Sequence, residues 1–517
     1  MKIRKFYLFI LIPIIFLLAN CSEDFDDAKI PNQAPNTFLF LKADTNISQQ
    51  RSRLQVHWWG DDSDGLIIGY YFKWEGVSDV WSFTTRNDSI FSLPIGTKDT
   101  TYNFLVAAVD NEGNGIYDYN VVFNNINLGP EPFIDSDGNS VYTPGEKFWD
   151  LGLIDPTPAN QIFPIKNTSP TIQWTKVTTL PATSFPVITV GWTTDDLDGI
   201  ETITKINIAL NDTNNSVALN GNVSLVTLRV KDVNAANPTM QVLINGNENS
   251  IFSQELSNLK LDDNNVIYVQ AQDISGAKSE FIRIPDTNST WYVKKPKGNF
   301  LIIDDYPSGT TQANFYKSVF DTINSDALLN KYDIFDIENS PLPYSSITFY
   351  ETMKLFDYIF WYSDSKPTID MLTANVQKYI SQKGKIAFSM TFQRTTSDYT
   401  FDISIAQSFL PIDDFGETAP LDFMFPNALC VHSDTNDTYP ELKTTVTIGF
   451  VRTFIPSALA TKKVYELSSI QKTGNIAFMD NSKSLFFIGL PLHDCNGNGT
   501  VGRLLKKVFF EEFNMSL

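Results

Sequence analysis

The chain has 517 residues, of which 42% are hydrophobic and 13% aromatic, a composition that excludes wholesale disorder. The length is too great for one hydrophobic core and predicts about three or four domains. The formal net charge is −20 and the pI is near 4.6. Because binding a polyanion requires clustered Lys and Arg, and the sequence has no basic stripe, nucleic acid is excluded as an expected partner.

The first 20 residues predict an export signal. Lys2, Arg4 and Lys5 precede an apolar run from Phe6 to Ala19. As a helix rising about 1.5 Å per residue, this run is too short to cross a hydrocarbon core of about 30 Å. The pattern is therefore typical of a cleaved leader rather than of a membrane-spanning helix.

Leu18-Ala19-Asn20-Cys21 ends this leader and resembles the lipobox of bacterial lipoproteins, although Asn20 stands where that family usually has a small residue. The resemblance implies that Cys21 carries the lipid and begins the mature protein, anchored in the outer membrane or at the cell surface. The acidic residues 22–27 resemble the surface-export signal of Bacteroidetes-type lipoproteins. An ordinary secreted protein is the alternative. Residues 21–34 are expected to form a tether.

The chain then contains two copies of one pattern, which predict β-sandwich modules at residues 35–125 and 167–294. Both copies alternate apolar and polar residues in short runs separated by turn residues, as antiparallel strands do. The matched landmarks are Trp58–Gly65 with Trp192–Gly199, Val106–Gly113 with Val269–Gly276, and an upstream proline, Pro35 or Pro170. The modules resemble immunoglobulin-like or fibronectin type III-like domains. Their Asp-rich turns (61–64 and 195–198) are interpreted as solvated turns, with calcium binding as the alternative.

Residues 126–166 are predicted to be a linker that contains a calcium loop. Within Asp135–Glu146, oxygen donors fall at positions 1, 3, 5, 9 and 12, and the residue at position 7 can offer its backbone carbonyl. The predicted ligands are Asp135, Asp137, Asn139, Val141, Thr143 and Glu146. The loop resembles the EF-hand-like loops of bacterial extracellular proteins, although Ser140 stands where that motif has Gly. A structural calcium ion is the predicted cofactor; a polar linker without metal is the alternative.

From residue 297 to 517, buried strands alternate with amphipathic helices, which predicts an α/β domain with a mostly parallel sheet. This region resembles the class I glutamine-amidotransferase-like superfamily, which has a flavodoxin-like fold. Ser389 lies where that family has its catalytic cysteine, and His493 lies where its histidine is expected. The resemblance therefore implies a domain without the usual nucleophile. A Ser389–His493 pair is the alternative catalytic site.

Cys430 and Cys495 are the cysteines that remain after the anchor. An exported protein favours a disulfide between them. The other interpretations are two free thiols, or a zinc site completed by His432 and His493.

These observations predict a multidomain, lipid-anchored envelope protein with a non-enzymatic binding or assembly role, in which envelope proteins or glycans are the partners. The alternatives are an exported hydrolase that acts on peptides or glycans, and a solute-binding receptor that uses the α/β cleft.

Overall fold

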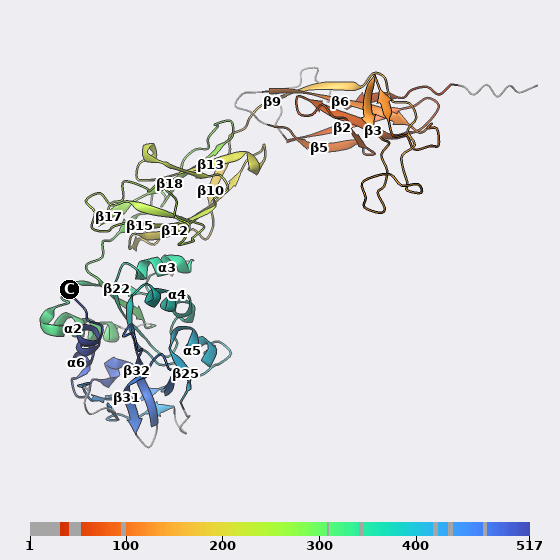
Figure 1. The fold of residues 1–517 in the computed structure, drawn as a ribbon. Helices are drawn as coiled ribbons and strands as arrows, with labels where there is room; N and C mark the ends of the chain where they lie inside the picture. Colours follow the sequence, from red (N-terminus) through yellow and green to blue (C-terminus); the bar gives the residue numbers. More distant parts are fainter. Residues whose placement is uncertain are drawn as a thin grey trace, which may run out of the picture. The chain divides into compact units, whose positions relative to one another are not determined.

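The computed structural model describes residues 31–40, 53–94, 100–307, 310–340, 345–416, 422–432, 438–468 and 473–516. Cys21, the predicted leader and most of the tether lie outside these residues. No helix in the described ranges is long and apolar enough to cross a membrane. The chain forms two compact units, one containing residues up to 168 with 197–199, the other containing 169–196 and 200–517. Strands dominate unit 1 and the first part of unit 2, and helices enter after residue 300 (Figure 1).

Unit 1 is built from two antiparallel sheets that share one core. The sheets have the strand orders β1-β2-β5 and β4-β3-β6-β9, and β7 pairs with β8 in a short hairpin. Aromatic side chains from both sheets fill the core, among them Trp58, Trp74 and Phe104, which are at most 5% exposed. The strands are β1 (Asn36–Leu39), β2 (Arg53–Asp61), β3 (Ile67–Glu75), β4 (Ser82–Thr84), β5 (Asp88–Ser92), β6 (Thr100–Asp110), β7 (Val121–Phe123), β8 (Ile126–Gly129) and β9 (Ala159–Ile165).

The segment predicted as a linker, residues 126–166, belongs to unit 1. Its strand β9 pairs with β6 along its whole length and buries Ile165 in the core. The preceding residues return to the same sheet, because the buried Asp110 carboxylate accepts the backbone N–H of Leu153 at 3.2 Å. The predicted boundary is therefore corrected: alternating apolar residues in 159–165 complete a sheet rather than span a gap.

The β-rich part of unit 2 has four-stranded antiparallel sheets of order β10-β12-β15-β16 and β14-β13-β18-β19, and a small sheet of order β11-β20-β17. Trp192 and Trp291 lie in the core with at most 1% exposure. The strands are β10 (Thr171–Trp174), β11 (Thr183–Ser184), β12 (Val187–Asp195), β13 (Ile203–Leu210), β14 (Val217–Asn220), β15 (Leu225–Val230), β16 (Met240–Ile244), β17 (Asp263–Asn265), β18 (Ile267–Asp273), β19 (Ile282–Ile284) and β20 (Trp291–Val293).

The duplicated landmarks occupy equivalent places in the two β-rich regions. In both regions, the residue after the upstream proline pairs with the first aspartate of the Asp-rich turn. In both regions, the strand that follows this turn also has a register shift directly after its pairing with the aspartate that ends the late strand. The equivalent pairs are Asn36–Asp61 and Thr171–Asp195, then Ile67–Asp110 and Ile203–Asp273. A shared register with a shared irregularity supports the internal duplication, because bulges are specific features of a sheet.

The third carboxylate of each aspartate-rich turn binds the backbone just before the upstream proline. Asp64 accepts the N–H of Gln33 at 3.1 Å, and Asp198 accepts the N–H of Thr168 at 2.6 Å. These hydrogen bonds give the motif a structural role in both copies, since each one fixes the start of the first strand.

The α/β region has a seven-stranded mixed sheet of order β22-β21-β23-β24-β33-β32-β31. The first five strands are parallel, and β32 and β31 add an antiparallel edge. Helices α2 and α6 cover one face, and α3, α4 and α5 cover the other (Figure 1). The sheet strands are β21 (Phe300–Asp305), β22 (Tyr332–Asp336), β23 (Tyr358–Ser363), β24 (Lys385–Ser389), β31 (Lys462–Ser468), β32 (Thr473–Met479) and β33 (Leu485–Ile488).

The described part of the α/β region contains five α-helices. They are α2 (Thr310–Asp326), α3 (Ser346–Met353), α4 (Ile369–Ser381), α5 (Ile403–Phe409) and α6 (Val501–Lys506), which continues as a π-helical turn (Lys507–Glu512). Among the described residues between β24 and β31 there are three two-stranded sheets. Their strands are β25 (Ile412–Phe415), β26 (Phe423–Met424), β27 (Leu429–Cys430), β28 (Leu442–Lys443), β29 (Ile448–Gly449) and β30 (Phe454–Pro456).

Helix α3 joins the two parts of unit 2. Glu351, whose side chain is 2% exposed, receives two hydrogen bonds from Arg229 of β15, both 2.8 Å long. The hydroxyls of Thr189 and Thr348 lie 2.5 Å apart across the same junction. The β-rich and α/β regions of unit 2 are therefore held together by buried polar contacts of defined geometry.

Candidate functional site

The predicted calcium loop brings three carboxylates together. The ligand atoms of Asp135, Asp137 and Glu146 all lie within 4.8 Å of one another. Asn139 and Thr143 contact this cluster, since the Asn139 amide and the Thr143 hydroxyl donate to Asp137 at 2.8 and 3.0 Å. The three carboxylates predicted at positions 1, 3 and 12 are thus close enough to bind one cation.

Backbone amides shape this loop from within. Asp135 accepts the N–H groups of Gly138 and Ser140 at 2.6 and 2.8 Å, and Glu146 accepts those of Ser136 and Thr143 at 2.7 and 2.9 Å. These donors favour the charged carboxylates, so the pKa of Asp135 is lowered mainly by the Ser140 N–H and that of Glu146 mainly by the Thr143 N–H. The loop therefore presents ionised hard oxygens at neutral pH, as calcium requires.

Ser140 adopts the left-handed backbone conformation that the sixth position of the motif requires. Its φ is 61°, in the region where glycine is favoured. The departure from glycine noted in the sequence is therefore accommodated as a strained backbone rather than as a different loop shape. The N–H of Val141 donates to the Asn139 side chain at 2.7 Å and completes the turn.

An aromatic cluster fixes the loop to the body of unit 1. Tyr142, inside the loop, stacks on Tyr117 with ring centroids 3.7 Å apart, and Phe133 and Phe148 pack edge-on against both rings. Phe133 and Phe148 also form a β-bridge across the base of the loop. The sequence analysis did not single out this cluster, because Tyr117 lies outside the motif and its position depends on tertiary packing.

At the carboxyl ends of the parallel strands, Tyr316 of α2 lies between Ser389 and His493. The Tyr316 hydroxyl is 3.2 Å from Ser389 Oγ and 3.2 Å from His493 Nδ1. The structure thus brings both predicted residues to one place and joins them through a tyrosine that the sequence analysis did not identify. Burial lowers the pKa of His493 and so favours a neutral imidazole, although the nearby charge of Asp494 acts in the opposite direction.

The Ser389 hydroxyl is fully buried and already hydrogen-bonded to the backbone. It donates to the Leu490 carbonyl and accepts the Leu492 N–H, each at 3.0 Å, and the residue is 0% exposed. These bonds tie the end of β24 to the turn after β33. The observed geometry gives Ser389 a structural role, because a nucleophile needs a general base in reach and access to substrate.

Asp305, at the end of β21, caps the start of helix α4. Its carboxylate accepts the N–H and hydroxyl of Thr368 at 2.8 and 2.6 Å, and the indole N–H of Trp361 at 3.1 Å. Burial raises the pKa of Asp305 to about 6, although these donors oppose the shift. The Asp305 carboxylate therefore has a structural role at this edge of the sheet, where it fixes the start of helix α4.

Cys430 and Cys495 are both free thiols in the structure, so of the three interpretations left open by the sequence the disulfide is not the one observed. Both residues are 0% exposed. Burial raises the pKa of Cys430 to about 12 and that of Cys495 well above its usual value. The thiolate forms needed for zinc binding are correspondingly disfavoured, and within the described ranges the grouped metal-ligand side chains are those of the 135–146 loop.

Comparisons with known proteins give little beyond this description. No protein-family model matches the chain, and no curated protein does. Among solved structures, the chain is similar to the fibronectin(III)-like modules of Clostridium thermocellum CbhA, with 12% identity and a TM-score of 0.15, over 50% of this chain and 94% of that one. It is also similar to the chicken interferon gamma receptor alpha chain, with 8% identity and a TM-score of 0.18, over 49% of this chain and 97% of that one. At these scores the similarities carry no functional argument.

Proposed function

We propose that the chain is a lipid-anchored envelope protein with a non-enzymatic binding or assembly role. In this proposal two immunoglobulin-like or fibronectin type III-like β-sandwiches carry an amidotransferase-like domain that lacks the catalytic cysteine. The paired sheets with shared cores support the sandwiches. The parallel strand order β22-β21-β23-β24-β33 supports the flavodoxin-like domain, since it is the order of that fold.

The observation that carries the non-enzymatic role is the burial of Ser389. Its hydroxyl is 0% exposed and is engaged by the backbone of residues 490 and 492. We expect an active-site-directed phosphonate to leave the chain unlabelled, with trypsin as a positive control for the reagent. Covalent labelling of Ser389, located by peptide mass spectrometry and lost in Ser389→Ala, would overturn the proposal.

The predicted lipid anchor at Cys21 is tested separately, because it lies outside the described residues. Mass spectrometry of the protein from the membrane fraction should show a lipidated N-terminal Cys21, since two or three acyl chains give firm binding where one does not. Cys21→Ser should release the protein into the soluble exported fraction. An unmodified thiol at this position in the membrane-bound protein would contradict the anchor.

We also propose a structural calcium ion in the loop 135–146, held by Asp135, Asp137 and Glu146. The ion would cross-link the two ends of the loop, which the Glu146 carboxylate already connects through the N–H of Ser136. Its role would be to hold the aromatic cluster, including Tyr117 and Tyr142, in a single arrangement. No catalytic step is assigned to it.

Calcium titration of the melting temperature tests this site. Extracellular calcium modules bind with dissociation constants of about 0.1–1 mM, so 10 mM calcium should stabilise unit 1 by about 1.4–2.7 kcal/mol and raise its melting temperature by about 3–10 °C. Asp137→Ala should abolish the rise, whereas Asp79→Ala, which removes an exposed aspartate elsewhere in unit 1, should preserve it. An equal rise in both variants would show that calcium acts elsewhere.

A further inference from the structure

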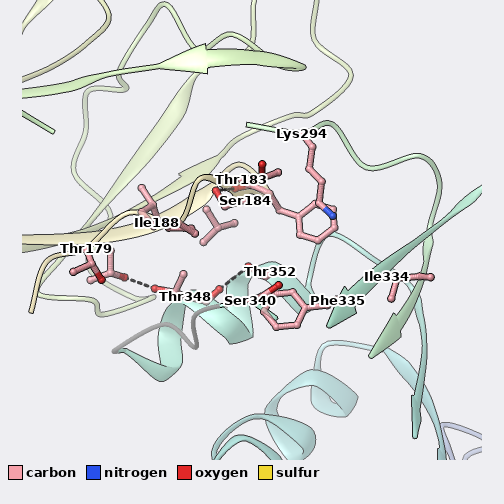
Figure 2. A pocket seen from close by; sticks show the side chains of 14 residues that line it. Thr179, Thr183, Ser184, Ile188, Lys294, Ile334, Phe335, Ser340, Thr348 and Thr352 are labelled. Atoms are coloured by element: carbon pink, nitrogen blue, oxygen red, sulfur yellow. Dashed lines mark hydrogen bonds between the residues drawn. The ribbon is translucent and has the colours of Figure 1, made fainter. Parts of the chain in front are cut away.

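A cavity of about 160 Å³ lies inside unit 2, where the β-rich region meets the α/β region. One wall comes from residues around β11 and β12, and the other comes from β22 and α3 (Figure 2). This cavity is separate from the carboxyl edge of the sheet, where Ser389 and His493 lie. It is also separate from the calcium loop, which belongs to unit 1.

The walls of the cavity are mainly apolar. Phe185 and Ile188 are 3% and 6% exposed, and Phe335 faces them from β22. Several hydroxyls of the lining are already hydrogen-bonded to protein: Thr189 pairs with Thr348 at 2.5 Å, and Ser184 donates to the carbonyl of Phe185 at 2.7 Å. These hydroxyls therefore shape the cavity and hold its walls together without being required to recognise a ligand.

Lys294 is the cation of the cavity lining. Its ammonium lies 4.0 Å from the centroid of the Phe185 ring. Within the described ranges its ion-pair partner is Asp333, and the 3.9 Å between Nζ and the Asp333 carboxylate exceeds hydrogen-bonding range. The other oxygen of Asp333 accepts the backbone N–H of Lys297 at 2.7 Å. An ammonium has three donors, so Lys294 retains capacity for an anionic acceptor.

From these contacts we propose that the cavity binds a small monocarboxylate with an apolar body, whose carboxylate pairs with Lys294. An apolar cavity of about 150 Å³ is known to hold benzene, so the volume suits a benzene-sized or short-chain organic acid. The apolar body would pack on Phe185 and Ile188, and the carboxylate would accept charge-assisted hydrogen bonds from the ammonium. This inference goes beyond the proposed envelope role and depends on neither the lipid anchor nor calcium.

Benzoate is the probe for this site, and benzyl alcohol is its neutral counterpart. In titration calorimetry of the whole chain we expect saturable binding of benzoate, with an affinity at least about 10-fold higher than that of benzyl alcohol. This factor is the contribution that a hydrogen bond to a charged group makes to binding. Lys294→Met should weaken benzoate binding by about the same factor and leave benzyl alcohol binding unchanged. Retained benzyl alcohol binding would show that the variant still folds around the cavity.

Lys297→Met is the matched control, because Lys297 is exposed and does not line the cavity. It should change benzoate affinity by less than about twofold, given that exposed charges contribute little. The proposal is overturned if benzoate shows no saturable binding at millimolar concentrations. It is equally overturned if Lys294→Met and Lys297→Met change benzoate binding to the same extent.

Discussion

Glu512 offers the sharpest test of how the α/β region is held together. Its side chain is 7% exposed, and its carboxylate lies 2.8 Å from the ammonium of Lys462 and 2.9 Å from that of Lys483. The hydroxyl of Tyr439 donates to it at 3.1 Å. Burial by itself would raise the pKa of Glu512, but the hydrogen bonds from the two lysines outweigh it and lower the pKa from 4.5 to about 2.

This pKa shift converts into a pH-dependent contribution to stability. At about 1.4 kcal/mol per tenfold change, lowering the pKa from 4.5 to about 2 corresponds to about 3 kcal/mol. Because the folded pKa is the lower one, the contribution is fully present above pH 4.5 and is lost as the pH falls toward 2. Glu512→Gln should therefore reduce the free energy of unfolding by about 3 kcal/mol at pH 7. The difference from wild type should narrow by about 1 kcal/mol at pH 4 and about 2 kcal/mol at pH 3.

Urea denaturation followed by circular dichroism at these pH values measures the difference directly. Glu511→Gln is the control, because the Glu511 side chain is 53% exposed and its partner Lys507 also donates to the Thr438 hydroxyl at 2.9 Å. That variant should lose less than about 0.5 kcal/mol. The reasoning is refuted if Glu512→Gln costs no more than Glu511→Gln, or if its cost stays constant between pH 7 and pH 3.

Three further outcomes are expected. Burial raises the folded pKa of Asp305 to about 6, so ionisation of this carboxyl opposes folding. Between about pH 4 and pH 6, the free energy of unfolding of Asp305→Asn should therefore rise relative to that of wild type by at most about 3 kcal/mol, measured by urea denaturation. A difference that stays constant over this pH range would contradict the prediction. Arg229→Met leaves the buried Glu351 with Lys354 alone, at 3.1 Å, and should lower the free energy of unfolding by about 3 kcal/mol. Adding Glu351→Gln in the same chain should restore part of this loss, because it removes the buried charge. If the double variant recovers nothing, the loss does not come from an unpaired charge. Ser140→Gly relieves a left-handed backbone. It should raise the free energy of unfolding by about 0.5 kcal/mol, seen as a higher melting temperature, and strengthen calcium binding by a similar free energy, whereas Ser140→Ala, which keeps the Cβ, should do neither.

The sequence alone predicted the features that depend on local order. Alternation of apolar and polar residues indicated the strands of both β-rich regions, and repetition of the Asp-Asp-x-Asp-Gly segment identified the duplication. The buried run Phe300–Asp305 and the helices that follow it predicted an α/β region. The spacing of the oxygen donors in 135–146 brought together Asp135, Asp137 and Glu146, because ligands within one short loop need no distant partner.

Tertiary structure decided everything that depends on pairing between distant segments. It added β9 to the sheet of unit 1, placed Tyr316 between Ser389 and His493, and left Cys430 as a buried free thiol. It also created the cavity beside Lys294, whose walls come from segments more than a hundred residues apart. Local periodicity shows which face of a strand is apolar, but not which other strand or helix covers that face. Burial, hydrogen-bond partners and cavities arise only when those covering elements are in place.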